Sequence, residues 1–503
     1  MNATRTKRAL RLCLWGLLPG LLLLIGAISK PTPPAVAEGA AAVTGVTAVT
    51  NPTDDAPLCR FGVNVTNNIN ATDLSPLRVG WYMNFGADAN PPRPNGIEYM
   101  PAIRFLPDTS AQGYTYAPSG ADLLDVIASN PGAKWLISNE PDSPFQDNLE
   151  PVVYARAYHE LYYLIKGHDP TAKIIIGSIV QATPVRLLYL DRVLISYHAQ
   201  YNDTLPTDGW SIHNYILNEV SCDYDPSNCW GADIPPGIEW PYGEVWGIRD
   251  NDRVDIFIER ITRFRQWLAN RGYTGQPIYL TEYSVLMPAD FIDEDGNAFP
   301  PARVNAFMAG TYNYMLAATD PILGDPNDGY RLVQQWAWFS TTEDVYNGSL
   351  FNRDTYTLTE IGNFFAGYTA SLNNEVDFYP SRISAGPPLP FSQGEPVTTT
   401  LHARIANSGN LATPITTTVR FYDAHPQNGG IQIGAEQIVS LSGCGDNQDV
   451  TVVWSNIPPG AYDVYVQVAV DTGEINTDNN IAAGRILIGT EITFLPTIRR
   501  SLP

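Results

Sequence analysis

Residues 134–142 read KWLISNEPD, a short apolar run that ends in a cluster of polar side chains. A second run of the same kind, residues 278–283, reads IYLTEY. Each run has the length and composition of a strand that is buried on both faces, which is typical of a parallel sheet. Each also places a glutamate, Glu140 or Glu282, at its end. We therefore take these two runs as the starting point for the fold.

Six further apolar runs accompany these two along the chain. The full set of eight is Arg60–Val65, Arg78–Phe85, Met100–Leu106, Trp135–Ser138, Lys173–Ile179, Gly209–His213, Pro277–Thr281 and Leu332–Trp338. Helical patterns separate several of them, at Pro151–Lys166, Arg253–Asn270 and Pro301–Ala318. Alternation of strands and helices predicts a parallel sheet, and eight units predict a closed (β/α)8 TIM barrel over residues 58–375.

The composition changes after about Pro380 to Thr- and Val-rich alternating stretches separated by turn signals, such as Asn428-Gly429-Gly430. This pattern predicts an all-β immunoglobulin-like sandwich over residues 395–489. The preceding segment, 376–394, is rich in proline and is predicted to be a linker. Residues 490–503 form a short tail to which we assign no function.

The N-terminus has the features of an export signal. Basic residues from Arg5 to Arg11 precede an apolar run from Leu12 to about Ile28, and Ala35-Val36-Ala37 follows as a cleavage site. Residues 1–37 are thus predicted to be a signal peptide or, alternatively, an uncleaved membrane anchor, and residues 38–57 a linker. Either alternative places the rest of the chain outside the cell or on its surface.

Composition narrows the range of partners. Acidic residues outnumber basic ones 52 to 30, which gives a net charge of −22, so we expect no nucleic-acid partner. The chain contains 27 Tyr and 11 Trp residues. Most of these fill the core, but aromatic faces are also the surfaces on which neutral sugars stack. We expect a polysaccharide substrate, and the oligomeric state is left open.

Five cysteines fit export into an oxidising compartment, with Cys13 in the signal segment. Cys222 and Cys229 lie close together in a loop-like segment and are predicted to form a disulfide. Cys59 and Cys444 fall in different predicted domains, and we interpret them as buried thiols rather than as a pair.

The two glutamates define the candidate chemistry. In a TIM barrel, catalytic groups lie at the carboxyl ends of the strands, and Glu140 and Glu282 end the fourth and seventh strands. Two carboxylates that face each other about 5 Å apart can hydrolyse a glycosidic bond with retention of configuration. A lone glutamate at a strand end is more often a helix cap or a surface ion pair, but that alternative weakens when both are present at this strand spacing.

Other polar and aromatic residues at strand ends are candidates for the substrate site. Asn139 can bind a sugar hydroxyl, and His213 and Tyr215 point the same way from the sixth strand. The same reasoning adds Trp81, Tyr82, Asn84, Trp336 and Trp338. We predict no metal and no cofactor, because no second histidine lies at ligand spacing from His213.

One long excursion follows the sixth strand. Residues 217–250 contain the aromatic residues Trp230, Trp240, Tyr242 and Trp246 behind the predicted disulfide. They form either a rim for extended glycan subsites or a loop that packs on itself.

Several motifs together resemble glycoside hydrolase family 128, within clan A of the barrel glycosidases. They are Trp81-Tyr82-Met83-Asn84, Glu98-Tyr99-Met100-Pro101, Ser138-Asn139-Glu140-Pro141-Asp142, Ile212-His213-Asn214-Tyr215, Thr281-Glu282-Tyr283 and Trp336-Ala337-Trp338-Phe339. The resemblance implies an endo-β-1,3-glucanase with Glu140 as acid/base, Glu282 as nucleophile, and Asn139, His213 and Tyr215 as supporting residues. Asn214 stands where the family usually has Trp, and the 217–250 excursion is long, so the glycan linkage stays open.

The sandwich resembles bacterial CARDB modules at Ile405–Gly409, Val419–Asp423 and Asn476–Asn480. Such modules are spacers or surface-binding units. The leading hypothesis is therefore an exported retaining glycoside hydrolase for a β-linked glucan. The alternatives are a hydrolase of xylan or mannan, or a non-catalytic glycan-binding or adhesion protein of the cell surface.

Overall fold

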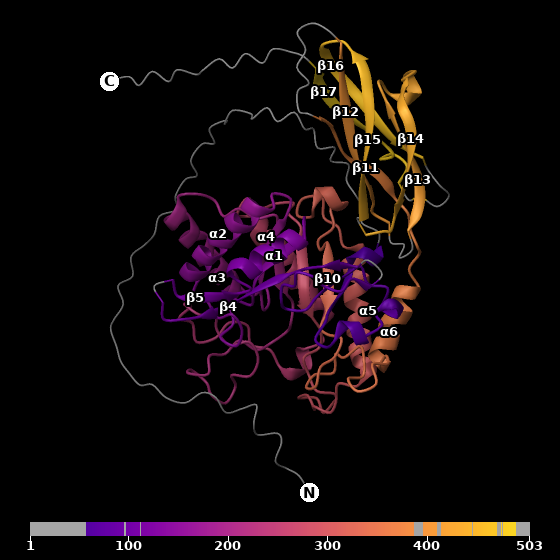
Figure 1. The fold of residues 1–503 in the computed structure, drawn as a ribbon. Coiled ribbons are helices and arrows are strands. Elements are labelled where there is room, and N and C mark those ends of the chain that lie inside the picture. Colours follow the sequence, from indigo (N-terminus) through magenta and orange to yellow (C-terminus); the bar gives the residue numbers. More distant parts are fainter. Residues whose placement is uncertain are drawn as a thin grey trace, which may run out of the picture.

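The computed structural model describes residues 57–94, 97–110, 112–386, 396–409, 414–444, 446–469, 474 and 476–488. They form an α/β barrel followed by a separate β-sandwich (Figure 1). The predicted signal or anchor at 1–37, nearly all of the linker at 38–57 and the tail at 490–503 lie outside these residues. Within them, no helix has both the length and the apolar character needed to cross a bilayer.

The eight predicted strands of the barrel are all present. Their bounds are β1 Phe61–Asn64, β2 Trp81–Met83, β4 Ala102–Pro107, β6 Lys134–Asn139, β7 Lys173–Ile179, β8 Gly209–His213, β9 Ile278–Tyr283 and β10 Gln335–Trp338. From β6 to β10 each strand pairs in parallel with the next along the chain, and β10 pairs in parallel with β1. All carboxyl ends of these strands therefore meet at one mouth of the barrel.

The barrel closes through the segment that contains β3 (Glu98–Tyr99) and β4. β3 pairs in parallel with β2, whereas β4 pairs in parallel with β6, and only Met100 and Pro101 separate β3 from β4. The two edges of the sheet are thus joined by one continuous stretch of chain. A further strand, β5 (Tyr114–Ala117), forms a hairpin with β4.

The described residues contain six α-helices rather than the eight of an ideal (β/α)8 barrel. They are α1 Gly120–Ser129, α2 Pro151–His168, α3 Pro184–Tyr201, α4 Val254–Ala269, α5 Pro301–Ala317 and α6 Glu360–Ala370. Short 3-10 turns at Ile69–Ala71 and Ser75–Leu77 replace a helix between β1 and β2. The β2–β3 connection contains Pro91, Pro92 and Pro94, which lack the amide donors that a helix needs.

The sandwich consists of two antiparallel sheets, as expected for an immunoglobulin-like fold. One contains β11 Phe378–Gly386, β12 Val397–Asn407 and β15 Asp446–Ile457, and the other contains β14 Gln432–Leu441, β13 Ile415–Tyr422, β16 Gly460–Val468 and β17 Ile481–Ile488. Because β11 pairs with β12 over its whole length, the prediction that 376–394 is a linker is wrong for 378–386. The sandwich therefore begins before residue 395.

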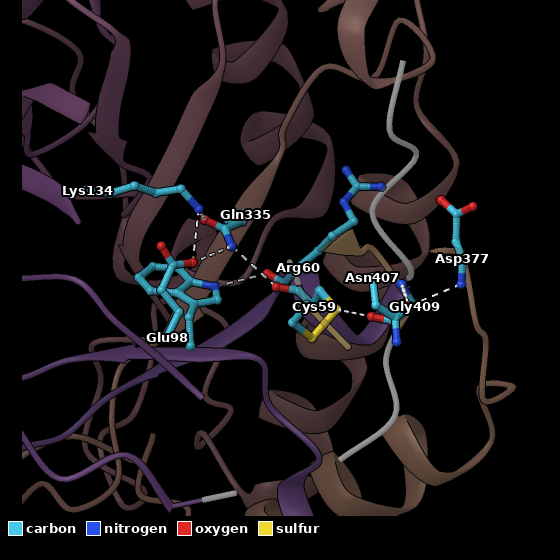
Figure 2. The surroundings of a disulfide bond; sticks show 10 residues. Cys59, Arg60, Glu98, Lys134, Gln335, Asp377, Asn407 and Gly409 are labelled. Atoms are coloured by element: carbon cyan, nitrogen blue, oxygen red, sulfur yellow. Dashed lines mark hydrogen bonds and ion pairs between the residues drawn. A yellow bond between two sulfur atoms is a disulfide. The ribbon is translucent and has the colours of Figure 1, made fainter. Parts of the chain in front are cut away.

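A disulfide between Cys59 and Cys444 joins the two domains, so the prediction that these cysteines are unpaired thiols is wrong (Figure 2). Cys59 precedes β1 and therefore lies at the end of the barrel opposite its mouth. There the sandwich approaches Glu98, Lys134 and Gln335, which begin β3, β6 and β10. Cys59 and Cys444 are 385 residues apart in sequence, but their Cα atoms are only 5.0 Å apart. The predicted disulfide between Cys222 and Cys229 is present.

Candidate active site

The ends of three strands bring Glu140, His213 and Glu282 together at the mouth of the barrel. Glu140 follows the last residue of β6, His213 is the last residue of β8, and Glu282 is the penultimate residue of β9. The barrel order places β7 and β8 between β6 and β9, so the two glutamates approach each other from separated strands. Both are almost fully buried, with exposed fractions of 8% and 6%.

His213 lies between the two carboxylates. Its Nδ1 donates to Glu140 Oε1 at 2.8 Å, and its Nε2 lies 3.3 Å from Glu282 Oε1, in ion-pair contact but without hydrogen-bond geometry. Tyr215 donates its hydroxyl to Glu282 Oε2 at 2.8 Å. One carboxyl oxygen of each glutamate and one His213 nitrogen all lie within 4.8 Å of one another. This spacing is that of the carboxyl pair in retaining glycosidases.

The shared environment changes the ionisation of these groups. Burial, aided by the charge of Glu140, raises the pKa of Glu282 to about 7, although His213 and the Tyr215 hydroxyl act in the opposite direction. Burial by itself lowers the pKa of His213, but the carboxylates of Glu282 and Glu140 outweigh it, so the net shift is upward. His213 and the Tyr215 hydroxyl are therefore the groups that favour the ionised form of Glu282, which a nucleophile requires.

The backbone that holds Glu140 is strained and is fixed by a residue that the sequence did not single out. Ser138 and Glu140 have φ angles of 84° and 48°, in a region that non-glycine residues rarely occupy. The carboxylate of buried Asp147 accepts hydrogen bonds from the Ser138 hydroxyl and from the backbone N–H of Asn139, both at 2.9 Å. It also forms an ion pair with Arg104 at 2.7 Å. Asp147 thus holds the end of β6 in the shape that presents Glu140.

Asn139, predicted to bind a sugar hydroxyl, is buried beside Glu140. Its Oδ1 atom is buried and has no hydrogen-bond partner among the described residues. An unpaired buried amide oxygen is uncommon in native proteins, so this atom is available to a ligand hydroxyl. The role of Asn139 in substrate binding stays a prediction.

Four other predicted substrate residues, all of them aromatic, do not reach the site. Trp81, Tyr82, Trp336 and Trp338 have no exposed surface. Trp81 fills the barrel interior beside Gly62, and the other three lie in the layer between the sheet and the helices. Asn84 is half-buried directly after β2; its Nδ2 donates to Asp88 and its Oδ1 accepts from Tyr99 of β3, and its role in substrate binding stays a prediction.

The aromatic residue that reaches the site from the end of β10 is instead Phe339, directly after Trp338. Its half-buried ring packs edge-on against Phe85 and Tyr215, with centroid distances of 6.4 Å to each. Tyr215 is itself the donor to Glu282, so this aromatic row borders the carboxyl pair. Phe339 and Ala337 lie on one face of the chain here, and Trp336 and Trp338 on the other.

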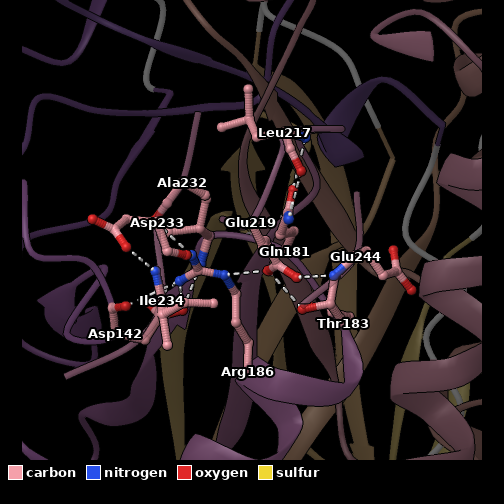
Figure 3. A network of polar contacts seen from close by, with 12 residues as sticks. Asp142, Gln181, Thr183, Arg186, Leu217, Glu219, Ala232, Asp233, Ile234 and Glu244 are labelled. Atoms are coloured by element: carbon pink, nitrogen blue, oxygen red, sulfur yellow. Dashed lines mark hydrogen bonds and ion pairs between the residues drawn. The ribbon is translucent and has the colours of Figure 1, made fainter. Parts of the chain in front are cut away.

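A buried ion network anchors the loops around Glu140 (Figure 3). Arg186, near the start of α3, pairs with Asp142 at 2.5 Å and with Glu219 at 2.7 Å, and all three side chains are fully buried. Arg186 also donates to the carbonyls of Ala232 and Asp233. Burial, opposed by Arg186, raises the pKa of Asp142 to about 6. The network connects the Glu140 loop to residues 217–250, which we call the insertion.

Glu140, His213 and Glu282 could each also offer one ligand atom to a metal ion. In the structure, however, His213 Nδ1 is already bonded to Glu140 and the second nitrogen faces Glu282. A metal would have to displace the first of these contacts. The absence of a metal from the mechanism stays a prediction, to be tested by chelation.

No protein-family profile and no curated protein matches this sequence. Solved structures similar to the chain include an endo-β-1,3-glucanase of glycoside hydrolase family 128, subgroup II, from Sorangium cellulosum. The two sequences are 16% identical, and the match covers 63% of this chain and 99% of that one, with a TM-score of 0.40. A subgroup I endo-β-1,3-glucanase from Amycolatopsis mediterranei, in complex with laminaritriose, matches at 16% identity over 61% of this chain and 98% of its own, with a TM-score of 0.39.

A curdlan-specific exo-β-1,3-glucanase of subgroup III from Blastomyces gilchristii, in complex with glucose, matches at 17% identity, over 63% of this chain and 99% of its own, with a TM-score of 0.38. All three structures come from the family that the sequence motifs resemble. The resemblance of the sandwich to CARDB modules stays a prediction.

Proposed function

We propose that this protein is an exported retaining glycoside hydrolase that cleaves a neutral β-linked glucan. The observation that carries the proposal is the approach of Glu140 and Glu282, whose nearest carboxyl oxygens lie within 4.8 Å at the barrel mouth. That distance leaves no room for the water that an inverting enzyme places between its carboxylates, at separations of about 6.5–9.5 Å. It does allow direct attack by one carboxylate on the anomeric carbon.

In the first step, Glu282 is the nucleophile and Glu140 the acid. Tyr215 donates to Glu282 Oε2, and this bond favours the ionised carboxylate that must attack. Glu140 uses only its Oε1 for a side-chain hydrogen bond within the described chain, which leaves Oε2 for the glycosidic oxygen. Glu282 forms a bond to the anomeric carbon while Glu140 gives its proton to the departing oxygen.

In the second step the covalent ester is hydrolysed. Formation of the ester removes the negative charge of Glu282, and with it the repulsion between the two carboxylates. Glu140 then accepts a proton from water, whose oxygen attacks the anomeric carbon and displaces Glu282. Two inversions at the same carbon give net retention. His213, in contact with both carboxylates, stabilises the negative charge as it moves from one to the other.

The finer features of the proposal rest on the sequence and on the resemblance. The motifs of family 128 favour a β-1,3-glucan, and the acidic surface, with a net charge of −22, disfavours an anionic polymer. The N-terminal segment supports export, followed by release or attachment to the cell surface. A hydrolase of xylan or mannan is the alternative within the same chemistry.

The test is hydrolysis of a panel of β-1,3-glucan, β-1,4-glucan, xylan and mannan by the purified protein, with the product anomer followed by proton NMR. We expect the β-anomer to appear first from one β-glucan, with activity unchanged by a chelator. First appearance of the α-anomer would exclude retention. Binding of a polymer without any release of sugar would favour the non-catalytic alternative.

A further inference from the structure

A hollow on the insertion has an aromatic lining that the proposed chemistry does not use. It has a volume of 430 Å³ and is lined by Pro184, Val185, Trp240, Pro241, Tyr242, Gly243 and Glu244. Trp240 and Tyr242 are 45% and 51% exposed, and nearby Tyr224 is 63% exposed. The rings of Tyr224 and Tyr242 lie 6.1 Å apart. These exposures exclude the interpretation that all the aromatic residues of the insertion serve to pack it on itself.

The backbone beneath this surface is held in place by buried polar contacts. Glu219 accepts hydrogen bonds from the Thr183 hydroxyl at 2.7 Å and from the Glu244 amide at 2.9 Å, in addition to pairing with Arg186. Gly243 passes so close to Glu219 that a Cβ atom there would lie 2.3 Å from its Oε2. The aromatic side chains therefore stand on a preorganised support, which reduces the entropy lost when a ligand binds.

Glu244 connects the same support to α4. Its carboxylate pairs with Arg260 at 2.9 Å and with Arg263 at 2.6 Å, and accepts a hydrogen bond from the Trp246 indole at 3.0 Å. Glu244 is also the one charged group among the residues that line the hollow. With its charge offset by the two arginines, the surface suits an uncharged ligand.

The hollow lies on the same side of the barrel as the carboxyl pair. The insertion begins four residues after His213, which ends β8 at the mouth, and Pro184 begins α3 just after β7. Arg186 binds both Glu219 beneath the hollow and Asp142, two residues after Glu140. The buried network thus fixes the surface relative to the catalytic centre.

We propose that Trp240, Tyr242 and Tyr224 form a secondary binding surface for the part of a neutral glucan chain that extends beyond the cleaved bond. This inference rests on the proposed function. The apolar face of a pyranose ring packs against an exposed aromatic ring, and the tyrosine hydroxyls bond the sugar hydroxyls. A chain bound at both places is held near the carboxyl pair between successive cleavages, because the second contact becomes intramolecular.

The test compares kcat/KM for a soluble β-1,3-glucan polymer with kcat/KM for an activated aryl β-glycoside too short to reach the insertion. In Trp240→Ala/Tyr242→Ala, we expect kcat/KM for the polymer divided by kcat/KM for the short substrate to fall at least about tenfold. A loss of about 1.4 kcal/mol of binding free energy produces a change of that size. Trp240→Phe/Tyr242→Phe should largely restore it. Tyr163→Ala is the matched control, because Tyr163 is a 49% exposed aromatic residue on α2.

Retention on an insoluble β-1,3-glucan, measured by co-sedimentation, separates this inference from the proposed function. If the wild-type protein releases no sugar from any polymer, the proposed function fails. If the wild-type protein cleaves the polymer but the double alanine variant keeps both its ratio and its retention, the secondary surface is refuted. Tyr242→Ala alone, which removes one half-exposed ring, gives the same comparison should the double variant not fold.

Discussion

Replacing Tyr215 by Phe removes one hydroxyl from the site and tests the assignment of Glu282 as the ionised nucleophile. The hydroxyl donates to Glu282 Oε2 at 2.8 Å in a buried setting. A hydrogen bond to a charged group contributes roughly 1.5–3 kcal/mol. One pKa unit corresponds to about 1.4 kcal/mol, so the pKa of Glu282, about 7 in the wild type, should rise by roughly 1–2.

The assay is the pH dependence of kcat/KM with an activated aryl β-glycoside, whose acid limb reports ionisation of the nucleophile in the free enzyme. Because Glu282 must lose its proton to attack, the acid limb of Tyr215→Phe should move to higher pH, and its activity loss should be larger at pH 6 than at pH 8. Tyr283→Phe is the control, since the Tyr283 ring packs against Phe257 and Trp338 away from the carboxylates. An acid limb that stays in place while activity falls equally at every pH would refute the reasoning.

Three further predictions concern stability. Folding raises the pKa of Glu282 from 4.5 to about 7, so the stability that Glu282 contributes is present below pH 4.5 and is lost as the pH rises through 7. Replacing Glu282 by Gln removes this loss. In urea unfolding, Glu282→Gln should therefore be more stable than wild type by about 3 kcal/mol at pH 8, and by far less at pH 5. An equal gain at both values would contradict this. Arg186→Met leaves Asp142 and Glu219 buried without their cation and should lower the free energy of unfolding by about 3–5 kcal/mol, with faster proteolysis of the insertion. Unchanged stability would mean that the network is dispensable. Cys444→Ser should let the barrel and the sandwich unfold in separate calorimetric transitions, and a single transition would contradict that account. Turnover of the aryl glycoside should be unchanged in this variant, because the disulfide lies at the end of the barrel opposite the mouth.

The strands and the carboxyl pair could be predicted from the sequence because each depends on local patterns. An apolar run that ends in Asn139-Glu140 or in Glu282 indicates a buried strand and places its polar end at the mouth. The order of the strands then follows from the chain order of a barrel. These inferences need no knowledge of how distant segments pack.

The aromatic residues of β10 were misplaced for a physical reason. A barrel strand is buried on both faces, so apolar residues occur at every position and alternation does not show which face is inside. Trp336 and Trp338 point to the helices, and the smaller Ala337 points into the barrel. Residue size does not show it either, because Trp81 fills the barrel interior beside Gly62.

The interdomain disulfide and the role of Asp147 had no local signal. Cys59 and Cys444 meet only because the sandwich docks at the end of the barrel opposite the mouth, which no stretch of sequence encodes by itself. Asp147 lies in a loop after β6 and acts through contacts with Ser138, Asn139 and Arg104 that exist only once the loop folds back. Both features depend on tertiary contacts.

Azide rescue tests the central claim most directly, namely that Glu282 forms a covalent intermediate that Glu140 helps to form and to hydrolyse. Glu140→Ala and Glu282→Ala would each be given an activated aryl β-glycoside with and without azide, and the anomer of any glycosyl azide identified by proton NMR. We predict that azide restores turnover of Glu140→Ala and yields the β-glycosyl azide, because azide replaces water in attacking the ester on Glu282. A β-glycosyl azide from Glu282→Ala, with the α-anomer from Glu140→Ala, would show that the two roles are reversed. Absence of rescue in both variants, in a protein whose wild type gives the α-anomer, would contradict the retaining mechanism.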